Sequence, residues 1–128
     1  MNGSVLIDSS VWISVVRPGG DEELKEEVGT LLQTGQAAIC APVWMELYRG
    51  IRGKREDAEL QRLRELCHWL DFDAACWDLA GSNGRIYLRA GVNVPTGDLL
   101  VHVCARRHGV RLLHRDRHFD LMDAACPL

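Results

Sequence analysis

The stretch Val5-Leu6-Ile7-Asp8-Ser9-Ser10-Val11-Trp12 joins a short apolar run to an acid and then to two serines. An uncharged, β-branched run such as Val5–Ile7 is typical of a strand that is buried on both faces of a sheet. Ser9 or Ser10 can cap a helix that starts directly afterwards. A carboxylate at the end of a buried strand is costly unless it has a partner, so Asp8 is a candidate functional residue.

Strands and helices alternate along the rest of the chain. Further short apolar runs predict strands at 37–40, 70–73 and 110–113. Helical periodicity and capping residues, among them Thr96, predict helices at 9–16, 21–32, 43–51, 56–70, 74–89 and 97–108. This order indicates an α/β fold, a parallel sheet of four to five strands between helices with right-handed crossovers. Its length of 128 residues fits one domain spanning 1–128.

Composition excludes several classes of protein. With 47% hydrophobic and 26% charged residues, the chain is an ordinary globular protein and not a disordered one. The number of cysteines, five, is odd, and the sequence contains no CxxC pair. Both observations indicate free thiols in a reducing compartment. Asp8 interrupts the first apolar run, and no run approaches the ~20 residues that span a bilayer. We therefore expect a soluble cytoplasmic protein without a membrane segment.

The distribution of charge is more informative than the net charge of −3, which does not indicate a nucleic-acid-binding protein. The segment 106–118 carries five arginines and the single acid Asp116. Arg115 and Arg117 flank that acid and are candidates for contacts with a polyanionic substrate such as RNA. An ordinary solvated surface explains the same arginines.

Four acids lie at the ends of predicted strands or near the starts of predicted helices. Asp8 ends the first strand, and Asp116 follows the last one. Glu46 lies early in the helix after the second strand, and Asp98 lies in the first turn of the helix before the last strand. The carboxyl ends of parallel strands meet at one edge of a sheet, where ligands bind near a switch in strand order. The four acids are therefore expected to converge.

Each acid also has an ordinary explanation. Asp8 can cap a helix, Glu46 can pair with Arg49, Asp98 suits a helix N-terminus, and Asp116 suits a turn. Four such coincidences at one sheet edge are less plausible than one shared site. Clustered carboxylates repel one another, and a divalent cation removes that conflict.

The donor set specifies the chemistry of such a site. Oxygen-only ligands suit Mg²⁺ or Mn²⁺, which retain waters that a phosphate group can replace. A bound cation can generate a nucleophile from water and stabilise charge that develops on a phosphodiester. Two cations about 3.5–4 Å apart could hold both the attacking and the leaving oxygen. The sequence does not distinguish one cation from two.

Four motifs resemble those of the PIN-domain ribonucleases, and within them the VapC toxins of bacterial toxin–antitoxin pairs. They are VLIDSSVW at 5–12, MELYRG at 45–50, VPTGDLL at 94–100 and LLHRDRHF at 112–119. Their order and spacing fit from one end of the chain to the other. Two positions depart from the family pattern. His114 stands where many relatives have threonine, and His118 stands where they have a second acid.

This resemblance implies a Mg²⁺- or Mn²⁺-dependent endoribonuclease that cleaves a structured cellular RNA, such as a tRNA or rRNA. The family's catalytic, metal-binding quartet falls on Asp8, Glu46, Asp98 and Asp116. Ser9 matches the small hydroxyl residue beside the first acid, which orients that acid or a metal-bound water. Such toxins form homodimers and are neutralised by a small antitoxin protein that wraps around them.

Three alternatives stay open. His114 and His118 have finger-like spacing, with His102 and Cys104 close by, but no paired cysteines accompany them as a zinc site would require. A magnesium-dependent phosphohydrolase acting on small esters would share the four acids without needing the flanking arginines. A non-catalytic RNA-binding module on the same fold would not need the acids.

Overall fold

The strand β1 (Val5–Ile7) lies inside a parallel sheet, between β2 (Ala37–Cys40) and β4 (Arg111–Leu113), and β3 (His68–Leu70) pairs with the far side of β2. The computed structural model describes residues 3–16 and 19–125; Pro18 and Cys126 lie outside them. Within these residues the sheet has four strands in the order β3-β2-β1-β4. The predicted parallel α/β architecture is confirmed.

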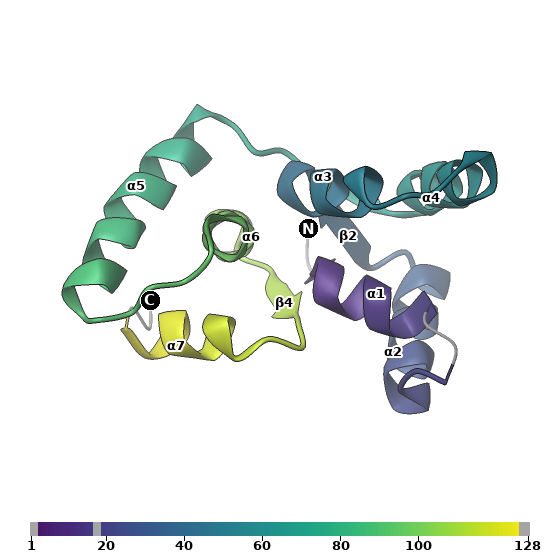
Figure 1. Cartoon of the computed structure of the whole chain (residues 1–128), viewed down its shortest axis with the longest axis horizontal. Coiled ribbons are helices and arrows are strands. Elements are labelled where there is room, and N and C mark those ends of the chain that lie inside the picture. Colours follow the sequence, from purple (N-terminus) through teal and green to yellow (C-terminus); the bar gives the residue numbers. More distant parts are fainter. Residues whose placement is uncertain (1–2, 17–18, 126–128) are drawn as a thin grey trace.

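Helices connect and cover the strands (Figure 1). Their bounds are α1 Ser9–Val16, α2 Glu22–Gln33, α3 Ala41–Arg49, α4 Lys54–Leu66, α5 Ala74–Arg89, α6 Thr96–His108 and α7 Arg117–Ala125. Figure 1 shows α6 end-on between α5 and the sheet, and α7 lies beside α6. Helices α1 to α4 lie on the opposite side of α6 from α5 (Figure 1). The strands β1 and β2 are buried along their whole length, as their apolar sequences predict.

The boundaries around β3 differ from the prediction. The helix expected over 56–70 ends at Leu66, and the strand expected at 70–73 occupies His68–Leu70. Cys67 has an extended backbone, and the three residues that follow pair with Ala38, Ile39 and Cys40 of β2. Pairing with an adjacent strand therefore overrides the helical periodicity of this segment.

The start of α6 also differs from the prediction. Thr96 is the first helical residue, and Pro95 occupies the cap position without a side-chain hydrogen bond. Pro95 has no hydroxyl to donate or accept there, and its φ of −58° and ψ of 145° give an extended entry to the helix. The other end matches the prediction, since Gly109 closes α6 in the left-handed conformation.

A polar network centred on the buried His102 joins α5, α6 and α7. The Tyr87 hydroxyl lies 3.2 Å from His102 Nδ1, and His102 Nε2 lies 2.7 Å from Asp123 Oδ1. Arg106 also donates to Asp123 Oδ1, at 3.0 Å. Burial lowers the pKa of His102. The network fixes α6 relative to α7. Asp98 lies in α6, and Asp116 directly precedes α7.

In the described part of the chain, no helix has the length and apolar character needed to cross a membrane.

Candidate metal centre

Asp8 is almost fully buried, at 2% exposed, and its two carboxylate oxygens have different surroundings. Oδ2 accepts hydrogen bonds from the Ser10 amide (3.1 Å) and the Ser10 hydroxyl (2.6 Å). Oδ1 is buried and has no hydrogen-bond partner among the described residues. Asp8 therefore caps α1 with one oxygen and leaves the other available. Ser10 makes the contact to Asp8 that was predicted for Ser9.

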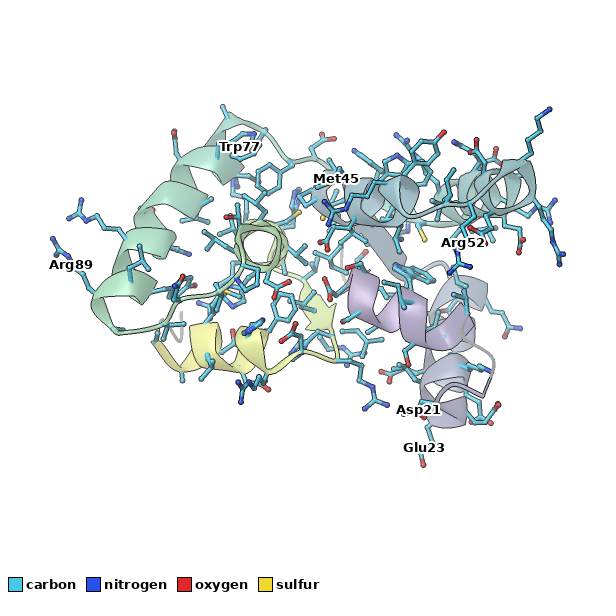
Figure 2. All side chains as sticks on the ribbon, viewed as in Figure 1. Asp21, Glu23, Met45, Arg52, Trp77 and Arg89 are labelled. Atoms are coloured by element: carbon cyan, nitrogen blue, oxygen red, sulfur yellow. The ribbon has the colours of Figure 1, made fainter. Side chains whose placement is uncertain are left out.

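Glu46 lies on the side of α3 that faces the start of α6; Met45 marks this part of α3 in Figure 2. Its Oε1 is a second buried carboxylate oxygen without a hydrogen-bond partner in the described residues. Burial raises the pKa of Glu46, and the charges of Asp8 and Asp98 raise it further. Arg49 and a hydrogen bond from Ser9 oppose that rise in pKa. Arg49 forms no ion pair with Glu46 within residues 3–16 and 19–125, so simple pairing does not explain this acid.

The close approach of α6 to Glu46 depends on Gly97. A Cβ atom at Gly97 would lie 3.2 Å from Glu46 Oε1, which is tighter than most side-chain contacts. A side chain at this position would push the carboxylate away from the start of α6. The residue before Asp98 is thus part of the geometry of the site, although it carries no functional group.

Asp98, Asp116 and His118 form the most compact part of the site. His118 Nδ1 lies 2.8 Å from Asp98 Oδ2 and 3.0 Å from Asp116 Oδ1. One ligand atom from each residue lies within 4.8 Å of the other two. Burial raises the pKa of Asp98; the charges of Asp116 and Asp8 act in the same direction, and the hydrogen bond from His118 opposes them.

The four predicted acids therefore converge, in two parts. Asp98 and Asp116 lie in the compact group, while Asp8 and Glu46 lie beside it and are coupled to it through their charges. The convergence occurs where the strand order switches, since β1 is followed by β2 on one side and adjoins β4 on the other. The Asp8 amide donates to the Leu113 carbonyl at 3.0 Å and so joins the ends of β1 and β4.

His118 joins the acids, although the sequence analysis singled it out only as a departure from the family pattern and as a possible zinc ligand. It lies two positions after Asp116, in the first turn of α7, and its backbone amide donates to Asp116 Oδ1 at 2.9 Å. The available signal was its position two residues after Asp116. His114 is placed differently: its ring packs against Phe119 at a centroid distance of 4.8 Å, and its Nε2 faces Asp120.

The zinc alternative is not supported by the geometry. His102 is held by Tyr87 and Asp123 and does not belong to the group that contains His118. In the part of the chain that the structure describes, Asp98, Asp116 and His118 are the one group of three residues placed to share a metal ion.

The two arginines beside Asp116 have different surroundings. Arg115 forms an ion pair with Asp21, the residue that caps α2 and is labelled in Figure 2. Its backbone amide donates to the Ser10 hydroxyl at 3.2 Å. Arg117 is exposed and forms no ion pair with any described residue. Of the two, Arg117 has the more available positive charge.

The residues present fit a divalent cation. Two buried carboxylate oxygens, Asp8 Oδ1 and Glu46 Oε1, have no partner in the described residues, and unpaired buried polar atoms are rare in folded proteins. Glu46 and Asp98 have raised pKa values because burial, and then the like charges of neighbouring acids, disfavour their ionised forms. A bound cation would satisfy the free oxygens and neutralise the repulsion.

Comparison with known proteins shows the family to which this chain belongs. The model of the PIN domain family matches residues 5–125. Ribonuclease VapC11 of Mycobacterium tuberculosis is 34% identical over 123 residues, covering 92% of this chain and 90% of that protein. The chain therefore belongs to the PIN-domain family, in its VapC ribonuclease branch.

Solved structures share the fold at lower sequence identity. The DNA-bound VapBC from Salmonella typhimurium superposes with a TM-score of 0.77 at 18% identity, covering 91% of this chain and 90% of that one. A toxin–antitoxin complex from Klebsiella pneumoniae gives a TM-score of 0.70 at 18% identity, covering 89% and 88%. These matches support the fold assignment.

We predict that Asp8→Asn stabilises the metal-free protein. The raised pKa values of Glu46 and Asp98 mean that the folded chain holds protons that the unfolded chain has already lost. The free energy of unfolding therefore falls as pH rises from the pKa values of these acids in the unfolded chain to their raised pKa values in the folded chain. Removing the Asp8 charge reduces that loss of stability. We expect a gain of about 1–2 kcal/mol near pH 7 that shrinks towards about pH 4.5, measured by urea unfolding in chelator.

The exposed Asp78→Asn on α5 is the matched control and should change stability little at either pH. Adding Mg²⁺ or Mn²⁺ should stabilise the native chain more than Asp8→Asn. A variant that is less stable than the native protein at neutral pH would contradict a destabilising repulsion between Asp8 and the neighbouring acids.

We predict that Gly97→Ala impairs the site while preserving the fold. Alanine is a better helix former than glycine, so α6 itself should not be weakened. The added methyl group displaces Glu46, and we expect RNA cleavage to fall by about tenfold to a hundredfold. Gly81→Ala on α5, where a Cβ has open space, is the control and should retain activity. Equal cleavage rates for the two variants would show that the close approach is not needed.

Proposed function

We propose that this protein is a Mg²⁺- or Mn²⁺-dependent endoribonuclease whose cation is held by Asp8, Glu46, Asp98 and Asp116. The observation that carries the proposal is the convergence of these acids with two buried carboxylate oxygens that lack a partner in the described residues. Membership of a ribonuclease family supports RNA as the substrate. A structured cellular RNA such as a tRNA or rRNA is the proposed target.

Each residue has a role that follows from its surroundings. Asp8 and Asp98 present oxygens from the starts of α1 and α6, and Ser10 holds Asp8 in orientation. Ser9 supports Glu46 through its side chain. When bound, the cation supplies an activated water and stabilises negative charge on the phosphodiester. Arg115 and Arg117 flank Asp116 in the sequence, and the exposed guanidinium of Arg117 suits the RNA backbone.

The two alternative functions on this fold are less well supported. A binding module without catalysis would gain nothing from carboxylates that repel one another in a half-buried site. A phosphohydrolase acting on small esters would not need exposed arginines beside the acids. Cleavage of RNA by the native chain distinguishes the proposed endoribonuclease from both of these functions.

The proposed assembly follows the family. We propose one PIN domain over 1–128, a homodimer in the cytoplasm, and a small antitoxin protein as the cognate partner. Similarity to a toxin–antitoxin complex supports the antitoxin. Exposed apolar side chains on the contacting helices α1 and α3, namely Ile13, Val16 and Met45, also support a protein partner close to the acids.

We predict that Asp98→Asn abolishes RNA cleavage with the fold retained. The substitution removes a charged ligand from the most compact part of the site, and we expect the rate to fall at least about a hundredfold. Chelation of divalent cations should stop cleavage by the native chain, and Mg²⁺ or Mn²⁺ should restore it. Induced expression in a bacterium, followed by mapping of new RNA ends, should yield ends with the native chain and none with Asp98→Asn.

Circular dichroism of Asp98→Asn serves as the control for folding. Cleavage that survives thorough chelation would indicate metal-free chemistry. Absence of cleaved RNA with the native chain, together with hydrolysis of small phosphate esters, would favour the phosphohydrolase instead.

We predict that Arg117→Ala and Arg115→Ala weaken RNA binding and reduce its salt dependence. Each lost phosphate contact should lower the slope of log affinity against log salt by about one. The measurement is fluorescence anisotropy of labelled RNA across a salt series in chelator. Arg89→Ala, at the outer end of α5 in Figure 2, is the matched control and should change neither quantity. Unchanged slopes for Arg115→Ala and Arg117→Ala would make these arginines a solvated surface.

A further inference from the structure

We propose that His118 is a direct ligand of the cation, through Nδ1, and that it makes the centre prefer a first-row transition-metal cation such as Mn²⁺ over Mg²⁺. This inference rests on the proposed metal-dependent function and adds the identity of a further ligand and the selectivity of the site. It depends on the position of His118 among the acids and on the free carboxylate oxygens beside it. His114, by contrast, packs against Phe119 and faces Asp120.

The donor atoms have the spacing of neighbouring metal ligands. His118 Nδ1 lies 2.8 Å from Asp98 Oδ2 and 3.0 Å from Asp116 Oδ1. Adjacent ligands of an octahedral cation with bonds of about 2.1 Å are separated by about 3.0 Å. The three donor atoms, which all lie within 4.8 Å of one another, can therefore occupy neighbouring positions around one ion with little movement.

The local backbone holds the imidazole in this position. His118 lies in the first turn of α7, and its amide donates to the same Asp116 oxygen that faces its ring. To bind a cation through Nδ1, the neutral ring must carry its hydrogen on Nε2. Nε2 makes no hydrogen bond to the described residues and is free to carry it. The ring is only partly exposed, so its Nδ1 faces the acids rather than bulk water.

A second, independent feature indicates a ligand at the same place. Asp8 is 2% exposed, and its Oδ1 has no partner within the described part of the chain. Its charge acts on Asp98, which places this carboxylate beside the group that contains His118. The site therefore offers one nitrogen and several carboxylate oxygens, of which at least one is buried and unsatisfied.

This mixed donor set predicts selectivity. Mg²⁺ favours oxygen ligands and water, whereas imidazole nitrogen is a better ligand for transition-metal cations. Replacing one carboxylate by an imidazole also lowers the negative charge of the site by one, which weakens a purely electrostatic attraction for Mg²⁺. His118 should thus shift the preference towards Mn²⁺ relative to an all-carboxylate site.

The test is metal binding by the full-length, metal-free protein, measured by isothermal titration calorimetry and by pulsed electron paramagnetic resonance of bound Mn²⁺. The variants are His118→Asp, which restores an all-oxygen site, and His114→Ala, a matched control that removes the neighbouring histidine. We expect nitrogen modulation from a coordinated imidazole in the native protein and in His114→Ala but not in His118→Asp. The ratio of Mg²⁺ to Mn²⁺ dissociation constants should fall by about tenfold or more in His118→Asp only.

Bound Mn²⁺ without nitrogen modulation in the native protein, or an unchanged selectivity ratio in His118→Asp, would overturn the inference and leave the proposed function intact. Failure of the native protein to bind either cation, together with cleavage that survives chelation, would overturn both. If His118→Asp does not fold by circular dichroism, His118→Gln serves in its place, and it should lose the nitrogen signal in the same way.

Discussion

The repulsion among carboxylates at the end of β1 is the constraint on which the rest of the structure depends. Asp8 is almost fully buried, and one of its oxygens is satisfied by Ser10 while the other has no partner in the described residues. Its charge raises the pKa of both Glu46 and Asp98. A fold that brings these groups together loses stability in the absence of a cation and regains it when one binds. Stability and activity are therefore expected to oppose each other at this site.

Several unrelated features keep the acids together despite this repulsion. The sheet places β4 beside β1, so the residues that follow both strands meet at the switch in strand order. Gly97 allows the start of α6 to approach Glu46. The buried hydrogen bonds of His102 connect α6 to α5 and α7, which holds Asp98 and the segment after Asp116 in register. None of these features contributes a carboxylate to the site, yet each positions one of the acids.

The candidate metal centre of this chain combines carboxylates with an imidazole. A histidine stands between two of the acids, where an all-carboxylate site would have only oxygen donors. Arg115 forms an ion pair with Asp21, which neutralises part of the positive charge beside the site. Arg117 therefore has the more available positive charge. The family thus identifies the class of chemistry, while the proposed preference for metal and the proposed contacts to RNA depend on the particular side chains around the acids.

The sequence by itself determined the alternation of strands and helices, the parallel sheet, and the four acids at its edge, because hydrophobic periodicity and position relative to a strand are local properties. Only the tertiary structure decided that β3 occupies His68–Leu70, that Ser10 rather than Ser9 holds Asp8, and that Arg115 pairs with Asp21. It alone brought His118 to Asp98, twenty residues earlier in the chain. Except for the local contact of Ser10 with Asp8, these contacts depend on how separate elements pack, and the distances between packed elements are not encoded in the pattern of any one segment.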